Sequence, residues 1–154
     1  MALDATAREA NLRDSIKKFF IDNLPSSVKI TFDRGLSSPN LSGHTTDTWV
    51  AVNFGNDDPG PLSVAFLLVY VCSRQDNEGY KLAQLRDKVV TILSNTTYSD
   101  GMQRIPFYAS HPTNPWTQVG TMLVQDFYIG NELRMEDETK YRLITVKLTW
   151  AAKV

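Results

Sequence analysis

The chain has 154 residues, of which 42% are hydrophobic and 21% are charged, and its formal net charge is −1 at pH 7. These values are typical of one soluble globular domain, here residues 1–154, and they exclude a strongly basic nucleic-acid binder and an acidic disordered tail. The single cysteine, Cys72, excludes an internal disulfide and a multi-cysteine metal site, and it fits synthesis in a reducing cytosol.

Residues 1–55 predict a helix followed by two strands. Apolar residues spaced by three and four positions predict one buried helix face that ends at Pro25; they are Leu12, Ile16, Phe19, Phe20 and Leu24. The stretch "SVKITF" alternates apolar and polar residues, as a half-buried strand does, and "TWVAVNFG" predicts a second strand with Val50, Val52 and Phe54 on one face. Between them, residues 33–47 form a long irregular loop, and loops of this length are often functional.

Residues 64–72 form an unbroken run of nine apolar or aromatic side chains. A helix that spans a membrane needs about 20 such residues, so we expect no membrane span here. The β-branched and aromatic content predicts a strand, and the unbroken hydrophobicity predicts that both of its faces are covered. A helix would cover one face. A second layer, from the same chain or from a neighbouring subunit, would cover the other.

The second half predicts another helix and a β-rich end. Residues 79–95 carry apolar side chains at helical spacing, namely Leu82, Leu85, Val89, Ile92 and Leu93. Pro106 interrupts a short strand, which suits the edge of a sheet. Residues 116–129 and 141–150 have the pattern of long strands, and a polar connection over 130–140 joins them. We therefore expect a projecting β-hairpin.

This order of elements predicts an α+β domain. Its sheet should be mainly antiparallel, with two α-helices packed on one face and a long C-terminal β-hairpin.

The sequence shows little sign of catalytic or metal chemistry. His44 and His111 lie in loops without a partner at metal-ligand spacing, and Cys72 ends an apolar strand as a buried, inert thiol would. The acidic residues between 132 and 138 lack the residue order of a calcium-binding loop. We expect no catalytic, cofactor-binding or metal site, and therefore a protein that is not an enzyme.

The most informative passage is "TDTWVAVNFG" followed by "PLSVAFLLVYVCSRQDNEGYKLAQLRDKVVTIL". It combines a strand that bears a tryptophan, an apolar strand, a polar corner and a helix with Leu and Val on one face. With the closing "YRLITVKLTWAAKV", it resembles the tail terminator, or tail completion, proteins of tailed bacteriophages. The resemblance covers nearly the whole chain and rests on the order of elements.

The resemblance implies a structural role in the virion neck, with assembly in the host cytoplasm and no cofactor. Subunits of this family form a closed ring, typically a hexamer, that caps the tail tube and stops its polymerisation. The ring contacts the tail tube protein and the head-completion or connector protein, and in contractile tails it can contact the sheath. DNA passes through its lumen.

Two alternatives stay open. One is another phage neck, head-completion or baseplate component. The other is a small ligand-binding or enzymatic α+β domain that uses Tyr108 or His111.

Three groups of residues are candidate contacts for a ring. Axial contacts to partner proteins are expected in the loop 33–47 and at the tip 129–140, at Arg34, Leu36, Asn40, His44, Arg134 and Met135. Contacts between subunits are expected at the edge strand "RIPFY" and in nearby strands, at Ile105, Phe107, Tyr108, Trp116 and Tyr141. An acidic lumen that repels DNA phosphates is expected from Glu132, Glu136, Asp137 and Glu138.

Overall fold

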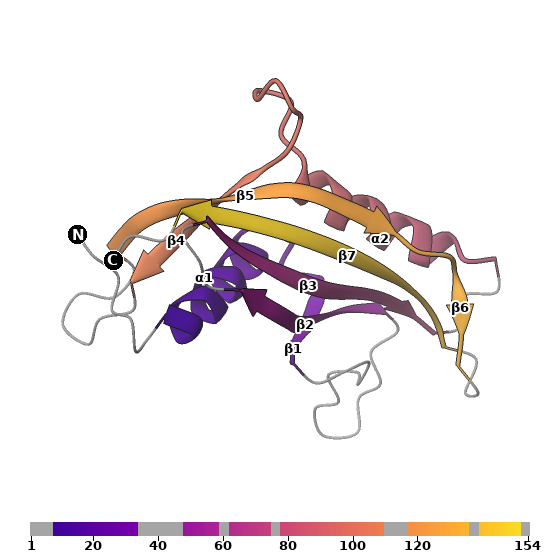
Figure 1. The fold of residues 1–154 in the computed structure, drawn as a ribbon. Coiled ribbons are helices and arrows are strands. Elements are labelled where there is room, and N and C mark those ends of the chain that lie inside the picture. Colours follow the sequence, from indigo (N-terminus) through magenta and orange to yellow (C-terminus); the bar gives the residue numbers. More distant parts are fainter. Residues whose placement is uncertain are drawn as a thin grey trace.

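The computed structural model describes residues 8–33, 48–58, 62–74, 78–109, 117–135 and 139–151. Two helices and seven strands follow one another in these ranges (Figure 1). They are α1 (Arg8–Asn23), β1 (Lys29–Phe32), β2 (Thr48–Asp58), β3 (Leu62–Ser73), α2 (Tyr80–Leu93), β4 (Arg104–Ala109), β5 (Thr117–Ile129), β6 (Leu133–Arg134) and β7 (Lys140–Ala151).

The strands form one sheet in the order β1-β2-β3-β7-β5-β4, and the short strand β6 pairs with β7 outside this path. All neighbours are antiparallel except β1 and β2, which run parallel. The predicted α+β domain with a mainly antiparallel sheet is therefore confirmed. The sheet curls, and its long strands β5 and β7 arch over α1 (Figure 1).

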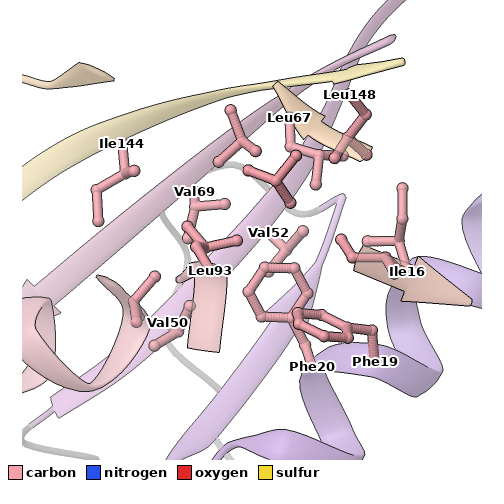
Figure 2. Packing of buried hydrophobic residues seen from close by; sticks show 14 of the residues in the cluster. Ile16, Phe19, Phe20, Val50, Val52, Leu67, Val69, Leu93, Ile144 and Leu148 are labelled. Carbon is pink, nitrogen blue, oxygen red and sulfur yellow. The ribbon is translucent and has the colours of Figure 1, made fainter. Parts of the chain in front are cut away.

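One apolar cluster joins the sheet to both helices (Figure 2). Alternate residues of β3, among them Leu67 and Val69, point into this cluster together with Val52 of β2 and Ile144 of β7. The helix residues whose spacing predicted a buried face are also buried here, including Ile16 and Leu24. Every second residue of the strands and every third or fourth residue of the helices therefore contributes to the same core.

Over the middle of β3, no described element forms a second layer on the opposite face of the sheet. Neither described helix contributes a buried side chain to this face. Phe66 of β3 is 39% exposed, and its neighbours Leu68 and Tyr70 are only half-buried. Of the two sources that the sequence left open for a second layer, the described residues of this chain do not supply one over Phe66. The alternative, a layer from a neighbouring subunit, stays a prediction.

The outer edge of β4 is closed by local groups. The Tyr108 N–H donates to Ser15 Oγ of α1 at 2.9 Å, and that hydroxyl in turn donates to the Asn11 carbonyl at 2.7 Å. Backbone N–H groups alternate in direction along a strand, so Arg104 and Pro106 face the same edge. The Arg104 N–H donates to Gln103 Oε1 at 3.0 Å, and proline has no N–H. These three positions offer no free donor to a strand of another molecule.

Replacing Ser15 with alanine tests this closure. The substitution leaves the part-buried Tyr108 N–H without its acceptor, so we expect the free energy of unfolding to fall by about 1–3 kcal/mol. Thr91→Ala is the matched control, because the Thr91 hydroxyl also bonds a carbonyl four residues earlier but lies exposed on α2. Chemical denaturation should show a change within about 0.5 kcal/mol for this control. Equal losses in the two variants would contradict the assigned role of Ser15.

Candidate assembly surface

The uncovered side of the sheet is a continuous surface, which we call the open face. We define it by the residues Phe66, Leu68, Tyr70, Tyr128, Leu143 and Thr145. The strand register places them on one side: Leu68 pairs with Thr145, which pairs with Tyr128, and Tyr70 pairs with Leu143. Tyr128 is 73% exposed. Lys147, which pairs with Phe66, lies on the same side, so the open face combines aromatic and aliphatic side chains with polar ones, as surfaces that bind other proteins do.

A second, smaller cluster closes one end of the open face. Trp49 and Cys72 are buried there, and Tyr70 and Tyr141 pack against them. The Arg74 guanidinium lies 4.9 Å from the centre of the Trp49 ring, a favourable cation–π distance. Burial raises the pKa of the Cys72 thiol to about 12, although the positive charge of Arg74 opposes the shift. The thiol is therefore neutral at pH 7 and is a poor nucleophile.

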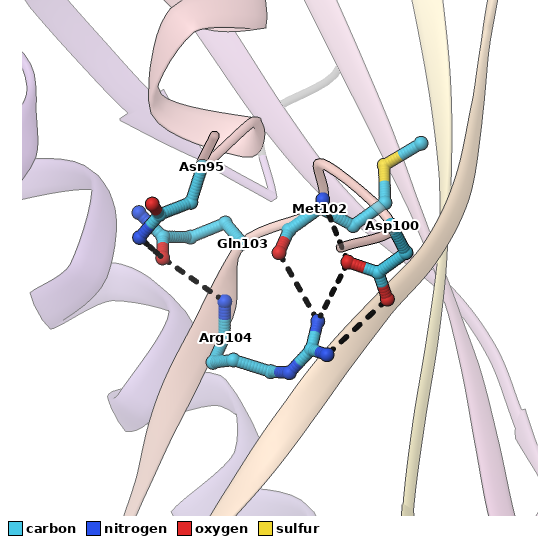
Figure 3. A network of polar contacts seen from close by, with 5 residues as sticks. All are labelled: Asn95, Asp100, Met102, Gln103 and Arg104. Carbon is cyan, nitrogen blue, oxygen red and sulfur yellow. Dashed lines mark hydrogen bonds and ion pairs between the residues drawn. The ribbon is translucent and has the colours of Figure 1, made fainter. Parts of the chain in front are cut away.

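A polar network organises the turn between α2 and β4, beside the open face (Figure 3). The guanidinium of Arg104 donates to both carboxylate oxygens of Asp100, at 3.4 and 3.2 Å, and to the Met102 carbonyl at 3.1 Å. The Met102 N–H and the Arg104 guanidinium hold the pKa of Asp100 below its usual value. Gln103 Oε1 also accepts from Asn95 Nδ2 at 3.1 Å. This network fixes the residues that close the β4 edge.

The structure buries two of the five predicted inter-subunit residues. Ile105 and Phe107 are buried in the core of the chain itself, and Tyr141 packs against the second cluster. These two side chains pack into the core of their own chain, so they do not supply side-chain contacts to another subunit; the predicted contact through this edge strand stays a prediction. Tyr108 is half-buried, with Lys18 Nζ 5.8 Å from its ring centre. Trp116 lies outside the described residues.

Few of the predicted axial contacts can be placed. Arg134 is exposed on β6 and Met135, which follows it, is half-buried. Four others lie outside the described residues, namely Arg34, Leu36, Asn40 and His44. His111, the other histidine that we considered for chemistry, lies outside them as well.

One of the four predicted lumen residues, Glu132, has a definite neighbour. Gly79 caps the N-terminus of α2 at a φ of 72°, and a Cβ added there would lie 2.6 Å from Glu132 Oε1. Negative charge near a helix N-terminus is stabilising, so this placement predicts that Glu132 stabilises α2 of its own subunit. Glu132 is also exposed. The other three, Glu136, Asp137 and Glu138, lie outside the described residues.

A double-mutant cycle measures the contact between Glu132 and α2. We expect Glu132→Gln to lower the free energy of unfolding by about 0.3–1 kcal/mol in the wild type, because a charge at the helix terminus is lost. In a Gly79→Ala background the effect should vanish, since the new methyl group displaces the carboxylate. Gly101→Ala is the control background, because Gly101 has a similar φ of 70° and no neighbouring atom within 4 Å. Identical Glu132→Gln effects in both backgrounds, measured by chemical denaturation, would contradict this placement.

The described residues show no other candidate centre. No group of three or more His, Cys, Asp or Glu side chains among them is placed to hold a metal ion. In the same ranges, neither helix is long and apolar enough to cross a membrane.

The sequence analysis did not predict two features, namely the contact of Ser15 with the β4 edge and the position of the open face. Ser15 lies in a helical pattern, and its partner Tyr108 is distant in sequence, so no local signal links them. The open face was partly foreseeable, because an unbroken apolar strand requires cover on two sides. Which side the chain itself covers depends on where both helices pack.

Comparison with known proteins supports the fold alone. No protein-family model matches the chain, and no curated protein matches its sequence. Thirteen solved chains match it in structure. One of them has a TM-score of 0.55 at 9% identity and covers 88% of this chain and 93% of its own length. Its name carries no description of function, and an identity this low shows a shared architecture only.

Proposed function

We propose that this protein is a structural subunit that assembles into a ring, as the tail terminator proteins of tailed phages do. In this role the ring caps a tail tube, stops its growth and presents a surface to the head-side connector. The proposal includes no enzymatic activity and no cofactor. It places the protein in the virion neck, with DNA passing through the lumen of the ring.

The observation that carries the proposal is the open face. A sheet with one face packed on helices normally presents polar residues to water on the other face. Here the outward positions of the central strands include Phe66, which is exposed, and Leu68 and Leu143, which are half-buried, with exposed Tyr128 beside them on β5. Leaving these side chains in water forgoes hydrophobic stabilisation that a second subunit would supply. The open face therefore supports an assembly function over a monomeric one.

The blocked β4 edge supports assembly through a specific contact and disfavours uncontrolled pairing of strands. An exposed edge strand invites uncontrolled pairing with other chains, and this edge is blocked by Ser15, Pro106 and Gln103. A ring needs two different patches on each subunit, because its contacts are head-to-tail. In our proposal the paired strands β5 and β7 form a long hairpin that extends the open face, and both helices pack on the opposite face as the rigid support of the subunit.

The direct test is the mass of the protein in solution by light scattering, alone and mixed with short tail-tube assemblies. We expect a ring, or a monomer that becomes a ring at tube ends. A monomer that ignores tube ends would overturn the terminator function. A ring that forms but binds the head-side connector and not the tube would favour the neck or head-completion alternative.

A charged substitution in the open face should weaken assembly without unfolding the subunit. We expect Tyr128→Glu to reduce the association constant at least tenfold, since exposed aromatic residues often dominate the binding energy of an interface. Ile21→Glu is the matched control, because Ile21 is 60% exposed on α1, away from the open face. Sedimentation at several concentrations gives the association constants. Equal weakening by both substitutions, or none by Tyr128→Glu, would contradict the role of the open face.

A further inference from the structure

The sheet ends at β4 on one side and at β1, beside β2, on the other (Figure 1). We propose that β1 of one copy pairs with β1 of a second copy, antiparallel and around a two-fold axis at Thr31, so that two sheets become one. Pairing at an edge covers neither face of a sheet, so this contact leaves the open face uncovered. It goes beyond the proposed ring and does not depend on it.

The backbone of β1 turns every second residue away from β2. The two strands are parallel, and the Asp33 N–H, just after β1, donates to the Val52 carbonyl of β2 at 2.7 Å. N–H groups alternate in direction along a strand, so the odd-numbered residues of β1 turn theirs toward β2. Ile30 and Phe32 therefore turn both N–H and C=O outward. Neither of these two N–H groups donates to another described residue.

Outward N–H groups at the other side of the sheet have acceptors in their own chain. The Tyr108 N–H of β4 is bonded by α1, as described above. The same holds on β5 beyond the end of β4. There the Gly130 N–H donates to the Leu143 carbonyl of β7, so alternation turns the Phe127 N–H away from β7, and it donates to Asp126 Oδ1 at 2.8 Å. Natural sheets protect their edges in such ways, and β1 differs in keeping two outward residues for a partner strand.

The outward residues select a register for the pair. The antiparallel register that uses both of them in each copy sets Ile30 opposite Phe32 of the second copy. Thr31 then lies opposite its own counterpart, and Lys29 lies opposite Asp33 of the second copy. Pairs of a β-branched with an aromatic residue, and pairs of opposite charge, stabilise antiparallel strands. The sequence "KITFD" is therefore complementary to itself in the register that its backbone selects.

The apolar part of this edge is incompletely covered in one copy. Ile30 and Phe32 pack against the core but are only half-buried. A second β1 strand would cover part of the apolar surface that they leave in water. Lys17 Nζ of α1 already lies 5.9 Å from the centre of the Phe32 ring within the same copy, so this cation needs no partner from the second copy.

The charged ends of the strand make the pairing selective. Lys29 is exposed, and its long side chain can reach a carboxylate on a facing strand. Arg13 holds the Asp33 carboxylate at 2.8 Å and keeps its pKa below the usual value, so that carboxylate is ionised at pH 7 and would receive Lys29 as a second cation. A lysine on an edge normally discourages strand pairing. Here it disfavours strands that lack an acidic residue at the facing position.

Amide hydrogen exchange by NMR tests the pairing at the atoms concerned. The full chain carries Tyr128→Glu, which blocks the open face, so that association through β1 is measured alone. Sedimentation gives the fraction of dimer at each protein concentration. We expect the exchange of the Ile30 and Phe32 N–H groups to slow several-fold as dimer accumulates, because these groups become hydrogen-bonded. The Phe127 N–H, which has its acceptor in the same chain, is the internal reference and should not change.

A charge reversal tests the register. In the same background we expect Lys29→Glu to lower the dimer association constant about tenfold, because symmetry turns two attractive pairs into repulsive ones. Lys29→Arg should preserve the dimer. Lys88→Glu is the matched control, since Lys88 is exposed on α2 and undergoes the same change of charge.

Three results would each overturn the inference: no dimer at any concentration, a dimer with unchanged exchange at Ile30 and Phe32, or equal weakening by Lys29→Glu and Lys88→Glu. None of these results decides whether the wild-type protein forms a ring at tube ends, which light scattering tests separately. A failure of the ring with a dimer that meets all the expectations would overturn the proposed function and leave the β1 pair standing.

Discussion

The fold depends on which side chains pack against the two apolar faces of the central strand β3. Alternate residues of β3, such as Leu67 and Val69, pack into the core that both helices share. Because side chains on a strand alternate between faces, residues such as Phe66 and Leu68 necessarily point the other way. Buried side chains of both helices join the core cluster on that side, and no described helix contributes a buried side chain to the opposite side. The open face follows from this constraint.

The same constraint explains the differences between the ends of the sheet. Where the open face meets the second cluster, Trp49 and Cys72 find cover from aromatic neighbours and from Arg74. At the β4 edge, Ser15 reaches across from α1 to bond the Tyr108 N–H, and the turn network around Arg104 fixes the next residues. The β4 edge is therefore protected by polar contacts, while the middle of the sheet leaves Phe66 and Tyr128 exposed beside the polar residues Thr145 and Lys147 of β7. This combination favours assembly through a face over strand addition at β4.

Sequence patterns predicted the elements well and their surroundings less well. The alternation of Ile144, Val146 and Leu148 predicted β7 and its buried face correctly, because one face of that strand is polar. The unbroken apolar run in β3 predicted a strand. Hydrophobic periodicity does not show whether the same chain or another molecule covers the second face of a strand that is apolar on both faces. Ile105 and Phe107 show the same limit of sequence analysis at the candidate site, since they were predicted as inter-subunit contacts and their side chains lie in the core. Buried core and buried interface have the same composition, and only the three-dimensional packing assigned these two residues to the core.

The most direct test of the account is the accessibility of Tyr128 before and after assembly. Hydroxyl-radical footprinting with mass spectrometry measures it in the free subunit and in the assembled protein. Tyr80 on α2, also exposed, serves as the internal reference. We predict that assembly lowers the oxidation rate of Tyr128 several-fold relative to Tyr80, because the open face becomes covered. An unchanged rate at Tyr128 in a fully assembled sample would contradict the claim that this face is where the protein associates.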